Sequence, residues 1–365
     1  MIKTTPLHES HKSLGARMGE FAGYDMPLYY PEGVVKEHEW TRNSAGLFDV
    51  SHMGQVSIKG KGAQDFLQKL TPSSFGKLGI NRAKYTVLTN PQGGIVDDLM
   101  VTKTGEDDFH LVINAGCKDK DIAWMKNHLP SGLEFEHYED WSLLALQGPK
   151  AEGAVREALG IDLSDLPYMA LWYKDHTMFI SRLGYTGEDG FEISVPANKV
   201  LEVWKALLKN PAVKPVGLAA RDSLRLEMGY PLYGHDIDDK TTPVEAGLTW
   251  VMTKGHAGYI GADRIVPQLE KGSSRLRVGI KLTDRGVARE GSKIRHGNDD
   301  IGIMTSGGFS PTLKESIGMA YVDSAFAKPG ETVSVVVRDK SLAAKVCALP
   351  FVPAKTKSMK KKEAA

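Results

Sequence analysis

Hydrophobic and polar residues alternate along the first two thirds of the chain with the two spacings that distinguish strands from helices. Residues 55–59 alternate apolar and polar positions, as a half-buried strand does, whereas residues 63–70 repeat apolar positions at helical spacing. The turn at residues 90–94 contains Asn, Pro and two Gly, which predicts a hairpin between its flanking strands. The same patterns predict strands at 85–89, 95–102, 109–114, 143–146, 178–182 and 191–195, and helices at 118–128, 200–208 and 218–227.

The pattern changes near residue 276. From there on the chain contains short strand-like runs separated by Gly and Pro turns, without a convincing helix; they lie at 277–282, 317–322, 333–338 and 344–348. A small antiparallel barrel or sandwich suits such a segment. Residues 271–274, Lys-Gly-Ser-Ser, are small and polar and are typical of a linker into it.

Charge and composition exclude several classes of protein. The 365 residues include 46 basic and 45 acidic side chains, so the net charge is close to zero and does not favour a nucleic acid as partner. Five lysines lie within residues 354–365, a tail that we expect to be disordered. Two cysteines are too few for a disulfide framework, and no apolar run is long enough to cross a membrane. Without a secretory signal or transit peptide, we expect a cytoplasmic protein that binds neither nucleic acid nor membrane.

Asp97 and Asp98 interrupt a run, residues 93–101, that otherwise reads as a buried strand. Neighbouring strand residues point to opposite faces, so both carboxylates cannot lie on one solvated surface if the strand is in the core. One interpretation is an edge strand with one Asp in water and the other bonded to backbone N–H groups. The other is a cavity that holds a carboxylate for chemistry, because a buried carboxylate needs a partner.

Residues 184–192 contain three glycines spaced three apart. They lack the strand, helix and Gly-x-Gly-x-x-Gly spacing of a dinucleotide site, so a glycine-rich turn between two strands is the simpler interpretation. Glu192 is the exception, because it separates the apolar pair Phe191 and Ile193. A carboxylate there is suited to the paired donors of a guanidine-like edge, such as that of a pterin ring.

Charged residues recur in the predicted helix 218–227. Arg221, Asp222, Arg225 and Glu227 are spaced for ion pairs along a helix, and the planar guanidinium of Arg221 also suits a ligand carboxylate. His52 is either an acid–base group or, more simply, a hydrogen-bonded structural histidine. No His, Cys and Asp grouping has zinc spacing, and the serine-hydrolase and P-loop signatures are absent from the sequence.

Six motifs in this order resemble a known family, the aminomethyltransferases, which are the T-proteins of the glycine cleavage system. The likeness covers residues 3–353. The motifs are Phe-Asp-Val-Ser-His-Met-Gly at 48–54, Gly-Ile-Val-Asp-Asp-Leu at 94–99, Leu-Gln-Gly-Pro at 146–149, the glycine-rich segment 184–192, Gly-Leu-Ala-Ala-Arg-Asp at 217–222 and Thr-Ser-Gly-Gly-Phe-Ser-Pro-Thr-Leu at 305–313.

The resemblance implies an α+β fold of three domains, arranged like a clover leaf around a channel for tetrahydrofolate, with a C-terminal antiparallel β-barrel. We expect two interleaved α+β domains in residues 1–270 and the barrel in residues 276–353. The implied reaction passes an aminomethyl group from the lipoyl arm of the H-protein to N5 of tetrahydrofolate. Its products are 5,10-methylenetetrahydrofolate, ammonia and dihydrolipoyl-H-protein, and no metal is expected.

The resemblance also implies roles for individual residues. Asp98 matches the family's catalytic carboxylate, which stabilises positive charge that develops during transfer. Glu192 would bind the N–H edge of the pterin, and Arg221 the carboxylate-bearing side of the folate. The other folate-binding positions implied by the match are Met53, Tyr85, Asn114, Tyr168, Tyr185 and Arg289.

Two other functions share the fold. A folate-dependent demethylase would need the same pterin pocket, and a folate-binding protein of iron–sulfur cluster maintenance would not act as a transferase. The latter family carries a Lys-Gly-Cys-type motif, whereas the nearest match here, residues 254–256, is Lys-Gly-His. The chain also departs from the T-proteins after residue 353, where a lysine-rich end replaces an aromatic or arginine that contacts the folate tail. A solvated tail is the simpler interpretation there, and contact with an acidic H-protein is the alternative.

Overall fold

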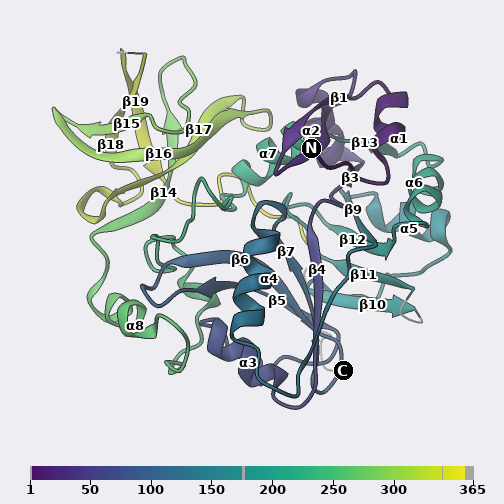
Figure 1. The fold of residues 1–365 in the computed structure, drawn as a ribbon. Helices are drawn as coiled ribbons and strands as arrows, with labels where there is room; N and C mark the ends of the chain where they lie inside the picture. The colour runs from purple at the N-terminus through teal and green to yellow at the C-terminus, as the bar shows by residue number, and fades with distance from the viewer. Residues whose placement is uncertain (1, 175–176, 339, 358–365) are drawn as a thin grey trace, which may run out of the picture.

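The structure is a computed structural model that describes residues 2–174, 177–338 and 340–357. Three parts surround a common centre, as Figure 1 shows. An eleven-stranded sheet with its helices forms the lower and right-hand parts, a small group of N-terminal elements lies at the upper right, and a barrel of strands lies at the upper left. The expected α+β fold with a C-terminal antiparallel barrel is confirmed.

The large sheet is continuous but is built from two groups of strands. Its order along the sheet is β13 (Val213–Pro215), β3 (Ala45–Asp49), β9 (Trp141–Gln147), β12 (Gly190–Pro196), β11 (Met178–Arg182), β10 (Ala170–Lys174), β5 (Arg82–Thr89), β6 (Ile95–Lys103), β7 (Asp108–Ile113), β4 (Gly54–Lys59) and β8 (Glu134–His137). The groups meet where β10 pairs with β5 through one residue pair, Ala170 with Arg82. The hairpin predicted around residues 90–94 is β5 and β6.

Each group of strands has its own hydrophobic core under helices. α5 (Ala151–Leu159) and α6 (Val200–Leu208) cover the group that contains β3, β9 and β12, where Trp204 and Phe191 are fully buried. α3 (Ala63–Leu70) and α4 (Lys118–Asn127) cover the second group, where Phe66 and Phe109 pack together with Met125. The apolar faces predicted for α3 and α6 are therefore the faces that these helices bury.

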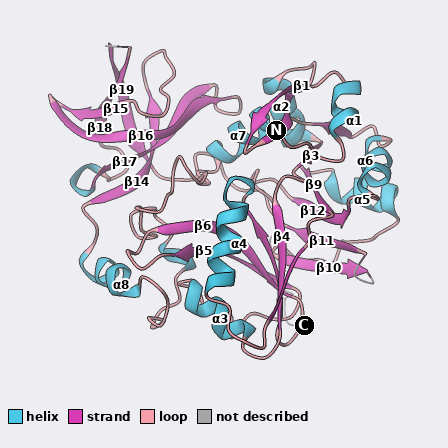
Figure 2. Ribbon diagram, viewed as in Figure 1, coloured by secondary structure: helices cyan, strands magenta, loops and turns pink. Residues whose placement is uncertain are grey.

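The C-terminal strands close into a barrel. Its order is β14 (Arg275–Leu282), β17 (Glu315–Asp323), β16 (Asp299–Ser310), β15 (Lys293–His296), β18 (Thr332–Val337) and β19 (Lys340–Cys347), with β19 paired back to β14. Figure 2 shows these strands without a covering helix layer. Alternate strand residues such as Ile280, Val335 and Val346 fill the interior, because successive side chains point to opposite faces. α8 (Ala262–Lys271) precedes the barrel and includes Lys271, so the linker expected at residues 271–274 is shortened to residues 272–274.

N-terminal elements join the sheet to the barrel. They comprise α1 (His8–Ser13), the hairpin β1 (Arg17–Phe21) and β2 (Tyr24–Tyr29), and α2 (Val34–Asn43), which packs against α7 (Leu218–Glu227). Glu227 of α7 accepts hydrogen bonds from Arg42 of α2 at 2.7 Å and from Thr312 after β16 at 2.8 Å. These buried charge-assisted bonds tie α2, α7 and the barrel into one unit.

The chain returns to the sheet after the barrel. The amide of Lys355 donates to the carbonyl of Gly187 at 2.7 Å, and its ammonium lies 3.2 Å from Glu188. Lys357 donates to Glu152 at 2.9 Å. The expectation of a disordered tail is therefore wrong for residues 354–357, where acidic partners hold the lysines, and residues 358–365 lie outside the described part. Within the described ranges, every helix is too short or too polar to span a membrane.

Candidate functional site

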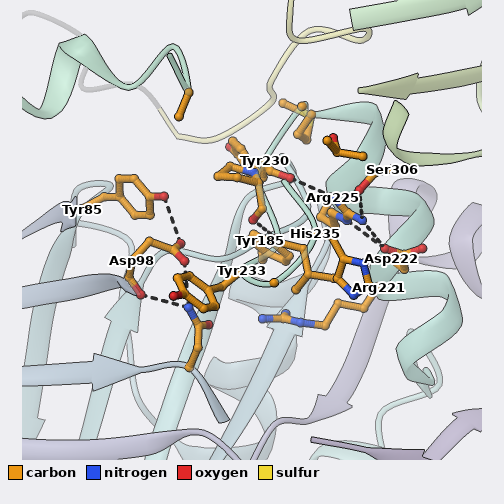
Figure 3. Close-up of a pocket in the computed structure, with 18 of the residues that line it drawn as sticks. Tyr85, Asp98, Tyr185, Arg221, Asp222, Arg225, Tyr230, Tyr233, His235 and Ser306 are labelled. Atoms are coloured by element: carbon orange, nitrogen blue, oxygen red, sulfur yellow. Dashed lines mark hydrogen bonds and ion pairs between the residues drawn. The ribbon is translucent and has the colours of Figure 1, made fainter. Parts of the chain in front are cut away.

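A cavity of about 1900 Å³ lies where the three parts of the molecule meet. All nine residues that the family resemblance assigns to the site line this cavity: Met53, Tyr85, Asp98, Asn114, Tyr168, Tyr185, Glu192, Arg221 and Arg289. Ligand pockets commonly measure about 300–1,000 Å³, so the space exceeds what one drug-sized molecule needs. Figure 3 shows part of its lining.

Asp98 lies on the inner strand β6, where the register places its partners. Leu99 pairs with Ile113 of β7, so Asn114 follows directly beside Asp98, and Val87 of β5 pairs with Asp98 on the other side. Tyr85, two residues from Val87, shares its face of the sheet. The Tyr85 hydroxyl donates to Oδ2 of Asp98 at 2.9 Å, as Figure 3 shows, and the Asn114 amide donates to Oδ1 at 2.8 Å.

Burial and the neighbouring charge of Asp97 raise the pKa of Asp98 to about 7, although the two hydrogen bonds from Tyr85 and Asn114 lower it. The edge-strand interpretation is wrong, because β6 lies between β5 and β7 and both aspartates are buried. With a pKa of about 7, Asp98 changes its charge near neutral pH. That property suits a carboxylate that must meet a developing cation.

Asp97 also contacts Asn114, through the same amide nitrogen and through the backbone N–H. Its Oδ2 accepts from the Asn114 backbone N–H at 3.2 Å, and its Oδ1 accepts from the Asn114 amide at 3.1 Å. Among the residues that the structure describes, Asp97, Cys117 and Asp121 are the one group with metal-ligand atoms within 4.8 Å of one another. Sequence spacing did not indicate this cluster, because the sheet register brings Asp97 to the start of α4.

Aromatic side chains form two stacked pairs in the cavity wall. Tyr85 stacks on Trp250 with ring centroids 5.4 Å apart, and Tyr185 stacks on Tyr230 at 5.6 Å. Trp250 is 66% exposed, which is unusual for so large an apolar ring. Sequence reasoning missed Trp250 and Tyr230. Neither residue belongs to a segment with a hydrophobic period, because Trp250 lies in the 3-10 turn Thr249–Val251 and Tyr230 lies outside the helices and strands, so no sequence pattern indicates them.

The glycine-rich segment positions Tyr185 and Glu192. It joins β11 to β12 as the predicted turn, and its glycines lie where no side chain fits: a Cβ on Gly184 would overlap the Gln147 amide, and one on Gly190 would overlap the Leu146 carbonyl. The chain thus folds tightly over the end of β9. Tyr185 is fixed there by a hydrogen bond to the Pro231 carbonyl.

Glu192 and Arg221 lie close enough for their charges to interact. Burial raises the pKa of Glu192, and the charge of Arg221 opposes that rise. The Arg221 guanidinium lies 4.9 Å from the centre of the Tyr185 ring, and its Nη1 is buried without a hydrogen-bond partner in the described part of the chain. A buried guanidinium nitrogen with no acceptor is a costly arrangement that a bound acceptor would relieve.

The charged residues of α7 divide between the two interpretations of that helix. Arg225 donates hydrogen bonds to Asp222 at 2.8 Å, to Asp236 at 2.7 Å and to Ser306 of β16 at 3.0 Å. Its role is therefore structural, because these bonds connect α7 to the barrel. Arg221 instead faces the cavity, as Figure 3 shows. The fixed helix therefore orients Arg221 toward a ligand.

The remaining expected residues lie around the rim and the wall. Burial, with the charge of Glu192 as a lesser cause, raises the pKa of Tyr168 to about 12. Arg289 donates to the Gly307 carbonyl at 2.9 Å and reaches the cavity from the barrel. His52 is buried edge-on to Phe21, and its Nδ1 finds no partner among the described residues, so the expected hydrogen-bonded histidine is not what the structure has.

Comparison with known proteins agrees with this geometry. The family model described as the GCVT N-terminal domain matches residues 7–256, and that of the glycine cleavage T-protein C-terminal barrel domain matches residues 275–353. An aminomethyltransferase of Halothermothrix orenii is 42% identical over 358 residues, which cover 96% of this chain and all of that protein. The mitochondrial aminomethyltransferase of Saccharomyces cerevisiae is 43% identical, over 96% of this chain and 95% of its own.

A solved structure extends the likeness to three dimensions. The crystal structure of glycine cleavage system aminomethyltransferase T from Bartonella henselae superposes with a TM-score of 0.94 at 41% identity, over 97% of this chain and 99% of that one. The two family models together cover residues 7–256 and 275–353, and each of the two relatives covers 96% of the chain, barrel included. The chain therefore belongs to the aminomethyltransferase family, the T-proteins of the glycine cleavage system.

Proposed function

We propose that this transferase moves an aminomethyl group from the lipoyl arm of the H-protein to tetrahydrofolate. The observation that carries the proposal is Asp98, held by Tyr85 and Asn114 and facing the same cavity as Glu192 and Arg221. The products are 5,10-methylenetetrahydrofolate, ammonia and the dihydrolipoyl H-protein.

Glu192 and Arg221 would bind the pterin end of tetrahydrofolate together. The Glu192 carboxylate accepts the paired N–H donors of the pterin edge, which makes a charge-assisted contact. Sequence reasoning assigned Arg221 to the carboxylate-bearing side of the folate. Because the charge of Arg221 acts on Glu192, we propose instead that its unpartnered Nη1 donates to the pterin carbonyl next to that edge. The arginine remains available to a carboxylate only if the folate lies the other way round.

The aromatic walls support a planar ligand. Tyr85 with Trp250, and Tyr185 with Tyr230, present flat surfaces whose stacking favours the rings of a pterin and an aminobenzoate. Met53 and Tyr168 add further wall, and Arg289 at the barrel side is positioned for the glutamate tail. The cavity of about 1900 Å³ exceeds the common size of a ligand pocket, which supports the proposal that the lipoyl arm enters it beside the folate.

Asp98 would act on charge rather than as a nucleophile. Transfer places positive charge on the attacking N5 or on an iminium-like carbon, and an ionised Asp98 stabilises that charge in a buried site, where electrostatic interactions are strong. Holding N5 against the aminomethyl carbon supplies much of the remaining rate. Tyr85 and Asn114 keep the carboxylate oriented and favour its ionised form.

The test is formation of methylenetetrahydrofolate from tetrahydrofolate and H-protein loaded with the aminomethyl group. Asp98→Asn should lower kcat by about 10²–10³ with a much smaller change in folate KM, because the lost interaction belongs to the transition state. Asp97→Asn is the matched comparison, since Asp97 also contacts Asn114 but has no bond to Tyr85. A larger loss in Asp97→Asn would move the role to that residue, and no product from the unaltered protein would refute the transfer itself.

A further inference from the structure

A second group of titratable side chains lies directly behind the Asp98 site. Asp97 of β6, Cys117 in the 3-10 turn Ala115–Cys117 and Asp121, one turn further along α4, have side-chain atoms within 4.8 Å of one another, and all three are buried. None of the roles proposed above uses Asp121. It nevertheless faces the aspartate that shares Asn114 with Asp98.

The hydrogen bonds around this cluster are unequal. Both oxygens of Asp97 accept from Asn114, whereas neither oxygen of Asp121 meets a donor within the part of the chain that the structure describes, and Asp121 is fully buried. Two ionised carboxylates this close in a buried site repel strongly, and one of them would lack any hydrogen bond. A proton on Asp121 resolves both problems, because it removes one charge and supplies the missing donor.

We propose that Asp121 is a positioning residue that stays protonated at neutral pH and donates a hydrogen bond to Asp97, so that the chain Asp121–Asp97–Asn114 fixes the amide that holds Asp98. The role in transfer rests on the proposed function, whereas the bound proton does not. The proposal involves no covalent step. The pair simply retains one proton between two carboxyl groups.

The surrounding charges support this protonation state. Burial and the charge of Asp97 raise the pKa of Asp121 well above its ordinary value, and Asp98 raises it further, while only Lys120 lowers it. Burial raises the pKa of the Cys117 thiol, so that group remains neutral beside the pair. The charge of Lys120 opposes the rise in the pKa of Asp121, but its ammonium donates to the Val96 carbonyl and lies 3.9 Å from the centre of the Tyr233 ring.

The same three side chains would be the ligands of a divalent cation. Two features disfavour a bound cation. Both Asp97 oxygens already accept hydrogen bonds from Asn114, and the positive charge of Lys120 lies near the cluster and would repel a cation. A cation favours ionised ligands, so proton and metal make opposite predictions for Asp121. They can therefore be separated by experiment.

Infrared difference spectroscopy of the whole protein detects the proton directly. At about pH 9, where Asp98 with its pKa near 7 is ionised, the unaltered protein should show the carbonyl stretch of a buried carboxylic acid that shifts in D₂O. Asp121→Asn should remove this band, and Asp119→Asn, an exposed acid on the same helix, should leave it. Absence of the band, or its persistence in Asp121→Asn, overturns the proposal. So does tight binding of added Zn²⁺ that abolishes the band.

Kinetics test the positioning role separately. Asp121→Asn keeps an N–H donor for Asp97, whereas Asp121→Val keeps the size but loses the donor. We expect Asp121→Val to lower kcat by about tenfold, the loss expected of one buried hydrogen bond, and to move the acidic limb of the pH profile upward. Asp121→Asn should recover most of both changes. Equal losses in the two variants overturn the positioning role, while loss of transfer in the unaltered protein refutes only the proposed function, since the infrared result stands without it.

Discussion

Replacing Asp98 by asparagine should stabilise the folded protein at alkaline pH, even though it impairs turnover. Burial and the charge of Asp97 raise the pKa of Asp98 from its ordinary value to about 7, so ionised Asp98 is unfavourable in the folded state. A rise from 3.8 to about 7 corresponds to about 4 kcal/mol at high pH. Asparagine removes this penalty and keeps the bonds, because it accepts from Asn114 and donates to the Tyr85 hydroxyl, which also accepts.

The sign of the pH dependence follows from the raised pKa. The contribution of Asp98 to the free energy of unfolding is fully present below its pKa in the unfolded chain, near 4. It is lost as pH rises through the pKa of Asp98 in the folded protein, about 7. The stability advantage of Asp98→Asn should therefore grow by about 2–3 kcal/mol between about pH 5 and about pH 8.5 and then level off.

Urea unfolding of both proteins across that range measures the advantage, with Asp119→Asn on the exposed side of α4 as the control whose difference from the unaltered protein stays flat. A difference for Asp98→Asn that is independent of pH, or that shrinks as pH rises, would refute the assignment of a raised pKa. The result would also place the catalytic carboxylate among those residues that a protein retains at the expense of stability.

Three further changes have defined outcomes. Glu192→Gln should weaken tetrahydrofolate binding about 10- to 150-fold in calorimetric titration, because an amide presents a donor to the donors of the pterin edge. Tyr85→Phe removes a hydrogen bond that lowers the pKa of Asp98, so the acidic limb of the kcat profile should move to higher pH. Glu227→Ala should destabilise the protein by about 3–5 kcal/mol in urea unfolding, because it removes the nearer of the two carboxylates that pair with the buried Arg42. Glu227 is itself buried, but hydrogen bonds chiefly from His38, Ser310 and Arg42 lower its pKa to about 2, so its contribution is lost as pH falls from about 4.5 through that value.

Local patterns predicted the elements whose cores are apolar. The hairpin of β5 and β6, the amphipathic helices α3 and α6, and the barrel strands follow from periodicity and turn residues. α2 was not predicted, because its buried residues are Glu37, His38, Thr41 and Arg42, whose burial is stabilised by distant partners such as Glu227. Hydrophobic periodicity cannot indicate a helix that buries charge.

The site shows the same division. The nine expected residues came from the resemblance to the family, and their convergence on one cavity needed the folded chain. Asp121 and Trp250 escaped prediction for different reasons. The first looks like an ordinary acidic residue in the first turn of a helix, and only the register of β6 against β7 reveals that it meets Asp97. The second lies in a single 3-10 turn, Thr249–Val251, and stacks on Tyr85, which is distant in the sequence.

The pairing of β3 has a consequence for how the chain is synthesised. β3 pairs with β9 and β13, so Leu47 and Phe48 cannot be buried until the ribosome has released the chain through Pro215. The strands from β4 to β8, in contrast, are contiguous in the chain and pair among themselves, so they can fold before β3 has both of its partners. A nascent chain that stalls before β13 therefore leaves one side of the apolar strand β3 without its partner, which makes that interval one in which a chaperone matters.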